Sequence, residues 1–81
     1  MVDIVLLPEF IKAIKHLDKA GRVRLEAAIR RILENPERGK PLRHMRNERT
    51  FRMGSFRIIY SFQVSTLYLL KFENRESVYR R

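Results

Sequence analysis

The sequence predicts an α+β fold in which an N-terminal helical hairpin packs on one face of a small antiparallel sheet. Three observations support this prediction. The chain opens with a short apolar strand, two segments after it repeat apolar residues at helical spacing, and three later segments have strand character. The predicted order is therefore βααβββ. A chain of 81 residues can bury one two-layer core, so we expect a single domain over residues 1–81.

The first predicted strand spans residues 2–7 and carries apolar side chains on both faces, which is typical of an interior strand. Pro8 then suits the first turn of a helix, where a missing N–H leaves no hydrogen bond unmade. The apolar residues of this helix recur at i, i+3, i+4 and i+7 and are Phe10, Ala13, Ile14 and Leu17. This spacing predicts an amphipathic helix of about three turns.

The second predicted helix begins after Asp18, whose carboxylate can cap the helix N-terminus. Its single apolar stripe consists of Leu25, Ala28, Ile29, Ile32 and Leu33. Asn35 and Pro36 end the helix, because the residue before a proline is disfavoured in helical conformation. The connection around Asp18 is tight, so we expect an antiparallel helical hairpin whose apolar face is covered by the sheet.

Residues 36–48 contain two prolines and a glycine and show no periodicity, so a loop is predicted there. Three successive antiparallel strands are expected after it, near residues 49–53, 56–63 and 66–72. Gly54-Ser55 and Ser65 mark the two turns. The face of the middle strand that should pack on the helices consists of Phe56, Ile58, Tyr60 and Phe62.

The composition excludes several kinds of site. The absence of cysteine rules out disulfides, a cysteine nucleophile and thiolate metal sites, and it favours a reducing cytoplasm. His16 and His44 have no partner at ligand spacing and the acidic residues are scattered, so we expect neither a metal nor a cofactor. The N-terminal apolar stretch is too short for a signal segment or a membrane span, so a soluble protein without membrane contact is expected.

The charge is unevenly distributed along the chain. The net charge is +9, and residues 35–57 hold seven basic side chains against two acidic ones. A helix covered with salt bridges would balance its charges, so this excess predicts a polyanionic partner.

Two arginines are predicted to face each other across the hairpin. If the turn falls at residues 54–55, Arg52 lies opposite Arg57 and both side chains point to the helix-free face. Like charges in this position are destabilising, so either both side chains extend into water or the site is built for an anion. The last strand returns beside the central one, which brings Arg75 and Tyr79 within reach of the same face.

Two short motifs resemble a known family. GSFRIIY at residues 54–60 and NRESVYRR at residues 74–81 follow a strand, a helical hairpin ending in Asn-Pro and a basic GKPLR loop. Over essentially the whole chain, this arrangement resembles the RelE/ParE superfamily of toxins of type II toxin–antitoxin systems. The resemblance implies a RelE-like fold. RelE-like members cleave mRNA in the ribosomal A site, whereas ParE-like members share the fold and poison DNA gyrase.

The resemblance also implies site residues. In RelE-like enzymes, arginines and a tyrosine of these motifs lie close to the scissile phosphate, and the matching positions here are Arg52, Arg57, Arg75 and Tyr79. The basic loop would contact ribosomal RNA through Arg38, Lys40, Arg43, Arg46 and Arg49. One departure concerns the general base, because lysines found in well-studied relatives fall here on Glu48 and Thr50.

Metal-free RNA cleavage by the 2′-hydroxyl gives a 2′,3′-cyclic phosphate and a 5′-hydroxyl, and it needs charge stabilisation, a base and an acid. Arginines stay protonated and therefore suit phosphate binding. The candidates for the base are Glu48, Glu73, Glu76 and Tyr79. Tyr79 can instead stack on a nucleobase. Without an evident base, we expect a poor nuclease that depends on the ribosome to orient its substrate.

The leading hypothesis is therefore a ribosome-dependent mRNA endonuclease that inhibits translation. The alternatives are a ParE-like gyrase inhibitor without nuclease activity and a catalytically weakened RNA-binding relative. The resemblance implies a RelB-like antitoxin, and a basic toxin favours one that is acidic and partly disordered. Ile59 and the exposed end of the sheet are expected to receive it, and operator DNA would be bound only through the antitoxin complex.

Overall fold

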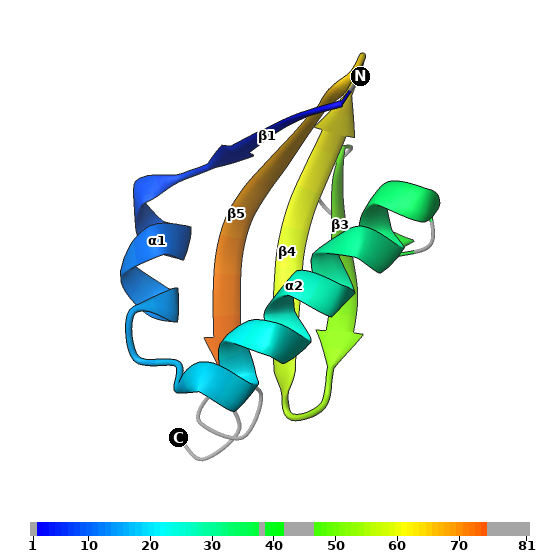
Figure 1. Cartoon of the computed structure of the whole chain (residues 1–81). Helices are drawn as coiled ribbons and strands as arrows, with labels where there is room; N and C mark the ends of the chain where they lie inside the picture. The colour runs from blue at the N-terminus through cyan, green and yellow to red at the C-terminus, as the bar shows by residue number, and fades with distance from the viewer. Residues whose placement is uncertain (1, 38, 42–46, 75–81) are drawn as a thin grey trace.

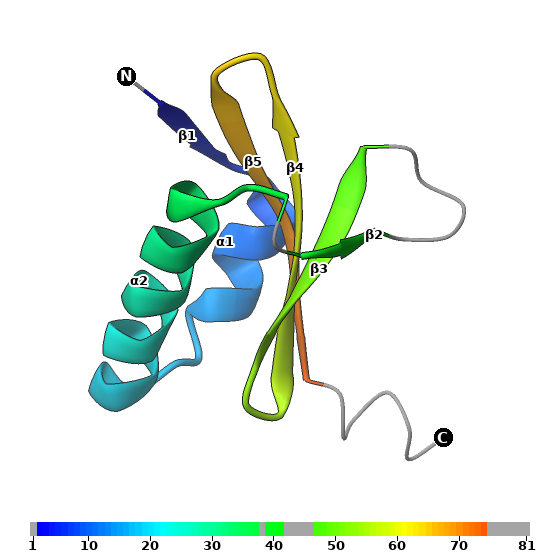
Figure 2. The same cartoon turned by 90° about the vertical axis from the view of Figure 1, so that its right-hand side faces the viewer.

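The computed structural model describes residues 2–37, 39–41 and 47–74. Within these residues, two helices cover one face of a five-stranded sheet, which confirms the predicted α+β fold (Figure 1). The view turned by 90° separates the two layers, with the helices on one side of the sheet (Figure 2). The described part of the chain places no helix on the opposite face, which we call the open face.

The sheet has the spatial order β1-β5-β4-β3-β2. Its strands are β1 (Asp3–Leu6), β2 (Lys40–Pro41), β3 (Glu48–Met53), β4 (Phe56–Gln63) and β5 (Thr66–Asn74). As predicted, the last three strands form an antiparallel meander. The two-residue strand β2 pairs with β3 and lies inside the segment that was predicted to be a loop.

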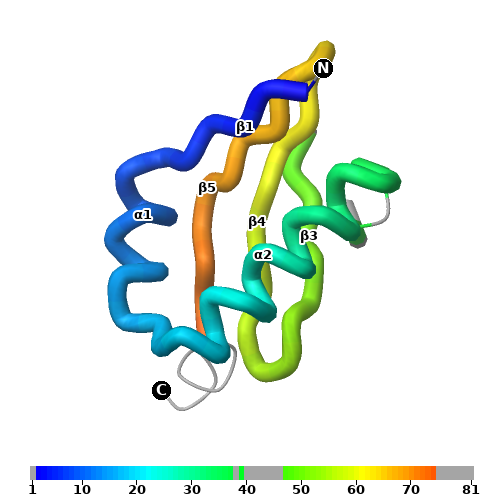
Figure 3. Tube along the Cα trace, in the orientation of Figure 1, coloured from blue at the N-terminus to red at the C-terminus, as the bar shows by residue number. Residues whose placement is uncertain are grey.

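The prediction that the first strand is interior is wrong. β1 pairs in parallel with β5 and forms an edge of the sheet, which is therefore mixed. All four of its residues are exposed, including Ile4 and Leu6 with 42% and 38% of their surface. Alternation of side chains cannot reveal an edge position, because it reports the two faces of a strand and not its neighbours. The start of β1 lies beside the β4–β5 turn, where Asp3 N–H donates to the Ser65 carbonyl over 2.9 Å (Figure 3).

The helical hairpin has a shorter first arm than predicted. Helix α1 (Pro8–Ile14) has Pro8 in its first turn but ends before Leu17, which still packs against the core. Helix α2 (Lys19–Glu34) is capped as expected, since the Asp18 carboxylate accepts a hydrogen bond of 2.7 Å from Gly21 N–H. None of the described helices is long and apolar enough to span a membrane.

The core lies between the helices and the central strands. Its largest fully buried side chains are Tyr60, Phe10, Ile32, Ile58, Leu67 and Leu69. Phe72 of β5 joins the layers, because its ring stacks on Phe56 at 4.8 Å and meets the ring of Phe10 edge-on at 6.0 Å. Ile58 and Tyr60 of β4 belong to this core and Phe56 and Phe62 pack against it, which confirms the predicted helix-facing side of β4.

A β-bulge changes the pattern of β5. Ile59 of β4 pairs with Lys71 and Tyr60 pairs with Leu69, so Leu70 has no partner in the register. The extra residue shifts the alternation, which brings Lys71 onto the same face as Ile59.

Candidate functional site

Three charged residues form a row across the open face, which we call the charged row. Arg52 of β3 lies opposite Arg57 of β4, as predicted, and Arg57 lies opposite Glu73 of β5. Cross-strand partners share a face of the sheet, so the three side chains leave the sheet on the same side. The order of charges across the row is positive, positive and negative.

Glu73 forms an ion pair with Arg57. Arg57 Nε donates a hydrogen bond of 2.7 Å to Glu73 Oε1, and Nη2 lies 2.7 Å from the same oxygen. The two side chains are half-buried, with 31% and 30% of their surface exposed. The carboxylate offsets the repulsion between the two arginines, which would otherwise destabilise the sheet. Arg52 is exposed and has no hydrogen bond or ion pair with another described residue.

Arg49 lies on the other face of β3 and contacts the segment that follows α2. Its Nη1 donates to the carbonyl oxygens of Glu37 and Gly39 over 3.2 Å and 2.9 Å. Its side chain is thus committed to two backbone acceptors on the helix side of the sheet, away from the charged row.

Tyr60 holds the same segment from the centre of the sheet. Its fully buried phenol donates to the Pro36 carbonyl over 2.6 Å and accepts from Gly39 N–H over 3.0 Å. A Cβ at Gly39 would come within 2.5 Å of this phenol oxygen, so only glycine fits there. Tyr60 and Arg49 together hold the backbone of Pro36, Glu37 and Gly39 against the sheet.

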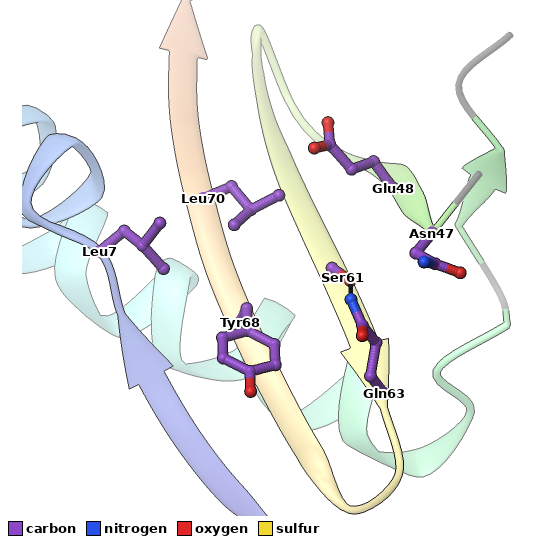
Figure 4. Close-up of a pocket in the computed structure, with 7 residues that line it drawn as sticks. All are labelled: Leu7, Asn47, Glu48, Ser61, Gln63, Tyr68 and Leu70. Carbon is purple, nitrogen blue, oxygen red and sulfur yellow. Dashed lines mark hydrogen bonds between the residues drawn. The ribbon is translucent and has the colours of Figure 1, made fainter. Parts of the chain in front are cut away.

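A hollow of about 450 Å³ opens on the open face (Figure 4). It is lined by Leu7, Asn47, Glu48, Ser61, Gln63, Tyr68 and Leu70. Gln63 Nε2 donates to Ser61 Oγ over 2.9 Å, which leaves the Gln63 amide oxygen as an acceptor. Leu70, the bulge residue, supplies part of the apolar lining together with Leu7.

The chain matches a family described as "ParE toxin of type II toxin-antitoxin system, parDE" over residues 4–79. The chain belongs to this toxin family. It is therefore a type II toxin of the RelE/ParE superfamily, as the two motifs suggested. No curated protein matches the toxin significantly by sequence.

Solved structures of related toxins share the fold. The intact RelBE toxin–antitoxin complex of E. coli contains a chain 18% identical to this toxin, with a TM-score of 0.80 over 91% of this chain and 96% of that chain. The RelB–RelE complex of Methanococcus jannaschii contains a chain 21% identical to this toxin, with a TM-score of 0.74 over 93% of this chain and 94% of that chain. YafQ of E. coli is 16% identical to this toxin, with a TM-score of 0.75 over 98% of this chain and 99% of that chain. At these identities the likeness shows the RelE-like fold alone.

The toxin's predicted site residues lie partly within and partly outside the described residues. Arg52 and Arg57 lie together as expected, and Lys40 lies in β2 opposite Thr50. The remaining predicted positions lie outside the described residues, and their roles stay predictions: Arg38, Arg43, Arg46, Arg75, Glu76 and Tyr79.

The positions of the family lysines carry no base close to the charged row. Thr50 has a buried hydroxyl without a hydrogen-bond partner among the described residues. Glu48 lies four residues from Arg52 along β3, which is about 13 Å at the rise of a strand, and lines the hollow instead. No three His, Cys, Asp or Glu side chains of the described chain come together as a metal site.

Ile59 is buried with 6% of its surface exposed, so the expectation that it offers the antitoxin a docking surface is wrong. It lies in the central strand β4, with Thr50 and Lys71 as its cross-strand partners. Sequence reasoning also missed the buried hydrogen bonds of Tyr60 and the position of Tyr68 in the lining of the hollow. The signal for Tyr60 was a hydroxyl in an otherwise apolar strand face, which needs a buried partner.

Proposed function

We propose that this toxin is a metal-independent endoribonuclease that inhibits translation in the cytoplasm by cleaving mRNA in the ribosomal A site. The observation that supports this function best is the adjacent pair of arginines, Arg52 and Arg57, on an open sheet face. Two guanidinium groups in this arrangement suit a phosphate, whose oxygens accept paired hydrogen bonds. The motifs that the chain shares with RelE-like members, which cleave mRNA, favour this branch of the superfamily.

The proposed chemistry uses the RNA as its own nucleophile. The 2′-hydroxyl gives up its proton and attacks the adjacent phosphorus, and the bond to the 5′-oxygen breaks. The departing 5′-oxygen takes up a proton from the solvent, so the products are a 2′,3′-cyclic phosphate and a 5′-hydroxyl. Arg52 and Arg57 stabilise the charge that develops on the phosphate oxygens. Arg75 and Tyr79 complete the site in this proposal, with Tyr79 stacking on a base or accepting the 2′-hydroxyl proton.

The hollow extends this site along the sheet. Ser61 lies four residues from Arg57 on β4, which corresponds to about 13 Å along the strand. A single RNA strand that crosses the open face would place its scissile phosphate at the charged row and an unstacked base at Tyr68. Glu48 in the lining repels phosphate, and its oxygens accept hydrogen bonds from base N–H groups, so a base suits the hollow better than the backbone does.

The proposal is tested by inducing the toxin in cells and mapping new 5′ ends in translated mRNA. We expect the wild-type toxin to produce cuts within codons, and these cuts should require translation of the message. The Arg57→Ala variant should produce no such cuts. Messages that stay intact during full growth arrest would reject the nuclease. A control message without a start codon should remain uncut, because free RNA lacks the orientation that the ribosome supplies.

Inhibition of DNA gyrase is the second candidate function. The family match over residues 4–79 favours it, since that family is described as the ParE toxin. A gyrase poison would inhibit supercoiling of plasmid DNA by purified gyrase and leave mRNA intact. The two functions are therefore separated by running both assays on the same toxin preparation.

We also propose a RelB-like antitoxin as the partner that holds the toxin inactive. Solved complexes of similar chains contain RelB, and the charge of +9 favours an acidic partner that folds on contact. The basic residues around Lys40 are proposed to contact ribosomal RNA, with operator DNA bound only through the antitoxin.

A further inference from the structure

We propose that Glu73 is a positioning residue that presents the guanidinium of Arg57 to the scissile phosphate. This inference rests on the proposed nuclease function. It gives Glu73, which the sequence indicated only as a candidate general base, a different role in the reaction. It starts from the geometry of the ion pair.

A guanidinium group carries five N–H donors in a rigid planar fork. Glu73 Oε1 contacts the edge formed by Nε and Nη2, with both nitrogens 2.7 Å away. The end of the fork, formed by Nη1 and the second hydrogen of Nη2, is left to bind another group. Two parallel N–H donors at this end match two oxygens of a phosphate. The carboxylate thus occupies one edge and leaves the phosphate-binding edge available.

The sheet supports this orientation. Arg57 and Glu73 are direct cross-strand partners on β4 and β5, so the backbone already holds their Cα atoms side by side. The half-buried pair also removes rotamer freedom from a long side chain before RNA binds. Arg52, on the other side of Arg57, is exposed and has no such restraint among the described residues. The charged row therefore combines one fixed arginine with one adaptable arginine.

Two other roles for Glu73 make different predictions. A general base would accept the 2′-hydroxyl proton at Oε2, since Oε1 already accepts from two nitrogens of Arg57. A carboxylate that merely competes with the phosphate for Arg57 would slow the reaction. The variants Glu73→Gln and Glu73→Ala separate the three roles. Glutamine keeps an acceptor oxygen for Arg57 but has no charge, whereas alanine has neither the acceptor nor the charge.

The experiment measures kcat and KM for cleavage of mRNA on programmed ribosomes. For a positioning residue, we expect Glu73→Gln to keep kcat within about threefold of wild type and Glu73→Ala to lower kcat about tenfold or more, without a rise in KM. Glu26→Gln is the matched control, since it removes the same charge from an exposed position on α2. It should leave both constants unchanged.

Other outcomes overturn the proposal. Equal losses in both Glu73 variants, with loss of the acidic limb of the pH profile, would identify a general base. A higher kcat in both variants would identify a competitor for the phosphate. Unchanged kcat in Glu73→Ala would remove any role for Glu73 in cleavage.

A second readout is independent of activity. The Nε–H resonance of Arg57 in ¹⁵N-labelled toxin should be protected from exchange with water in wild type and Glu73→Gln and unprotected in Glu73→Ala. Arg57→Lys identifies the signal by removing it. A protected signal in a toxin that never cleaves mRNA would mean that the nuclease function has failed, whereas cleavage by Glu73→Ala at the wild-type rate would mean that this inference has failed.

Discussion

The backbone N–H of Gly39 donates a hydrogen bond of 3.0 Å to the buried phenol oxygen of Tyr60. The same hydroxyl donates to the Pro36 carbonyl over 2.6 Å, so one side chain of the central strand satisfies two backbone groups of the segment after α2. This contact links the end of the helical hairpin to the sheet that carries the charged row.

Replacement of Tyr60 by phenylalanine should therefore destabilise the fold. Tyr60→Phe keeps the ring in the core but leaves the Gly39 N–H without its acceptor, and it removes the donor to Pro36. We expect the free energy of unfolding to fall by about 2 kcal/mol, measured by urea denaturation. Tyr68→Phe is the matched control, because its hydroxyl has no hydrogen bond to another described residue, and it should change stability by less than about 0.5 kcal/mol.

Gly39→Ala tests the same contact from the other side. The added Cβ would lie 2.5 Å from the Tyr60 oxygen and 2.9 Å from the Thr50 carbonyl oxygen. Because the two changes disrupt one contact, the double variant should lose less stability than the sum of the single variants. Strict additivity would contradict the linkage.

Replacing either arginine of the charged row should reduce activity, but only the replacement of Arg57 should lower the stability of the protein. Arg52→Ala and Arg57→Ala should each reduce mRNA cleavage about 100-fold, because each removes donors to the developing charge. Arg57→Ala also leaves the half-buried Glu73 unpaired and should lower stability by about 1 kcal/mol, whereas Arg52→Ala relieves repulsion and should not. Cleavage on ribosomes and thermal unfolding of the same preparations check both statements. Equal stability losses would argue against the ion pair.

Arg49 should behave as a structural residue. Arg49→Ala removes a charged donor from the carbonyl oxygens of Glu37 and Gly39 and should lower the free energy of unfolding by about 1.5 kcal/mol. If its main role were contact with ribosomal RNA, the variant would keep its stability and lose affinity for ribosomes in a salt-dependent manner. Urea denaturation and ribosome co-sedimentation at two salt concentrations distinguish the two roles.

Val64 in the β4–β5 turn should limit stability. It has a φ of 60° and 97% of its surface is exposed, so a β-branched residue adopts the left-handed region without any packing in return. Val64→Gly should raise the free energy of unfolding by about 1 kcal/mol. The exposed Val23 of α2 is the control, because glycine there should lower stability. A loss of stability in Val64→Gly would refute the strain.

Much of this fold could be predicted from local patterns. The cap at Asp18, the turn at Gly54 and Ser55 and the opposition of Arg52 and Arg57 depend on residues a few positions apart, whose geometry is set by the backbone. The edge position of β1 could not be predicted, because it depends on β5, the last strand of the sheet. The bulge at Leu70 was equally inaccessible, since one unpaired residue leaves no clear signature in an apolar strand.

By itself, the sequence determined the class of fold, the order of its elements except the short strand β2, the superfamily and the concentration of positive charge. These properties follow from periodicity, turn residues and composition, which act over short distances along the chain. Only the tertiary structure decided which charges meet. It paired Arg57 with Glu73 across two strands, turned Arg49 toward the Glu37 and Gly39 carbonyls and gathered residues of four segments around the hollow. Contacts of this kind depend on strand register and on which face each side chain occupies, and those are fixed only when the sheet is complete.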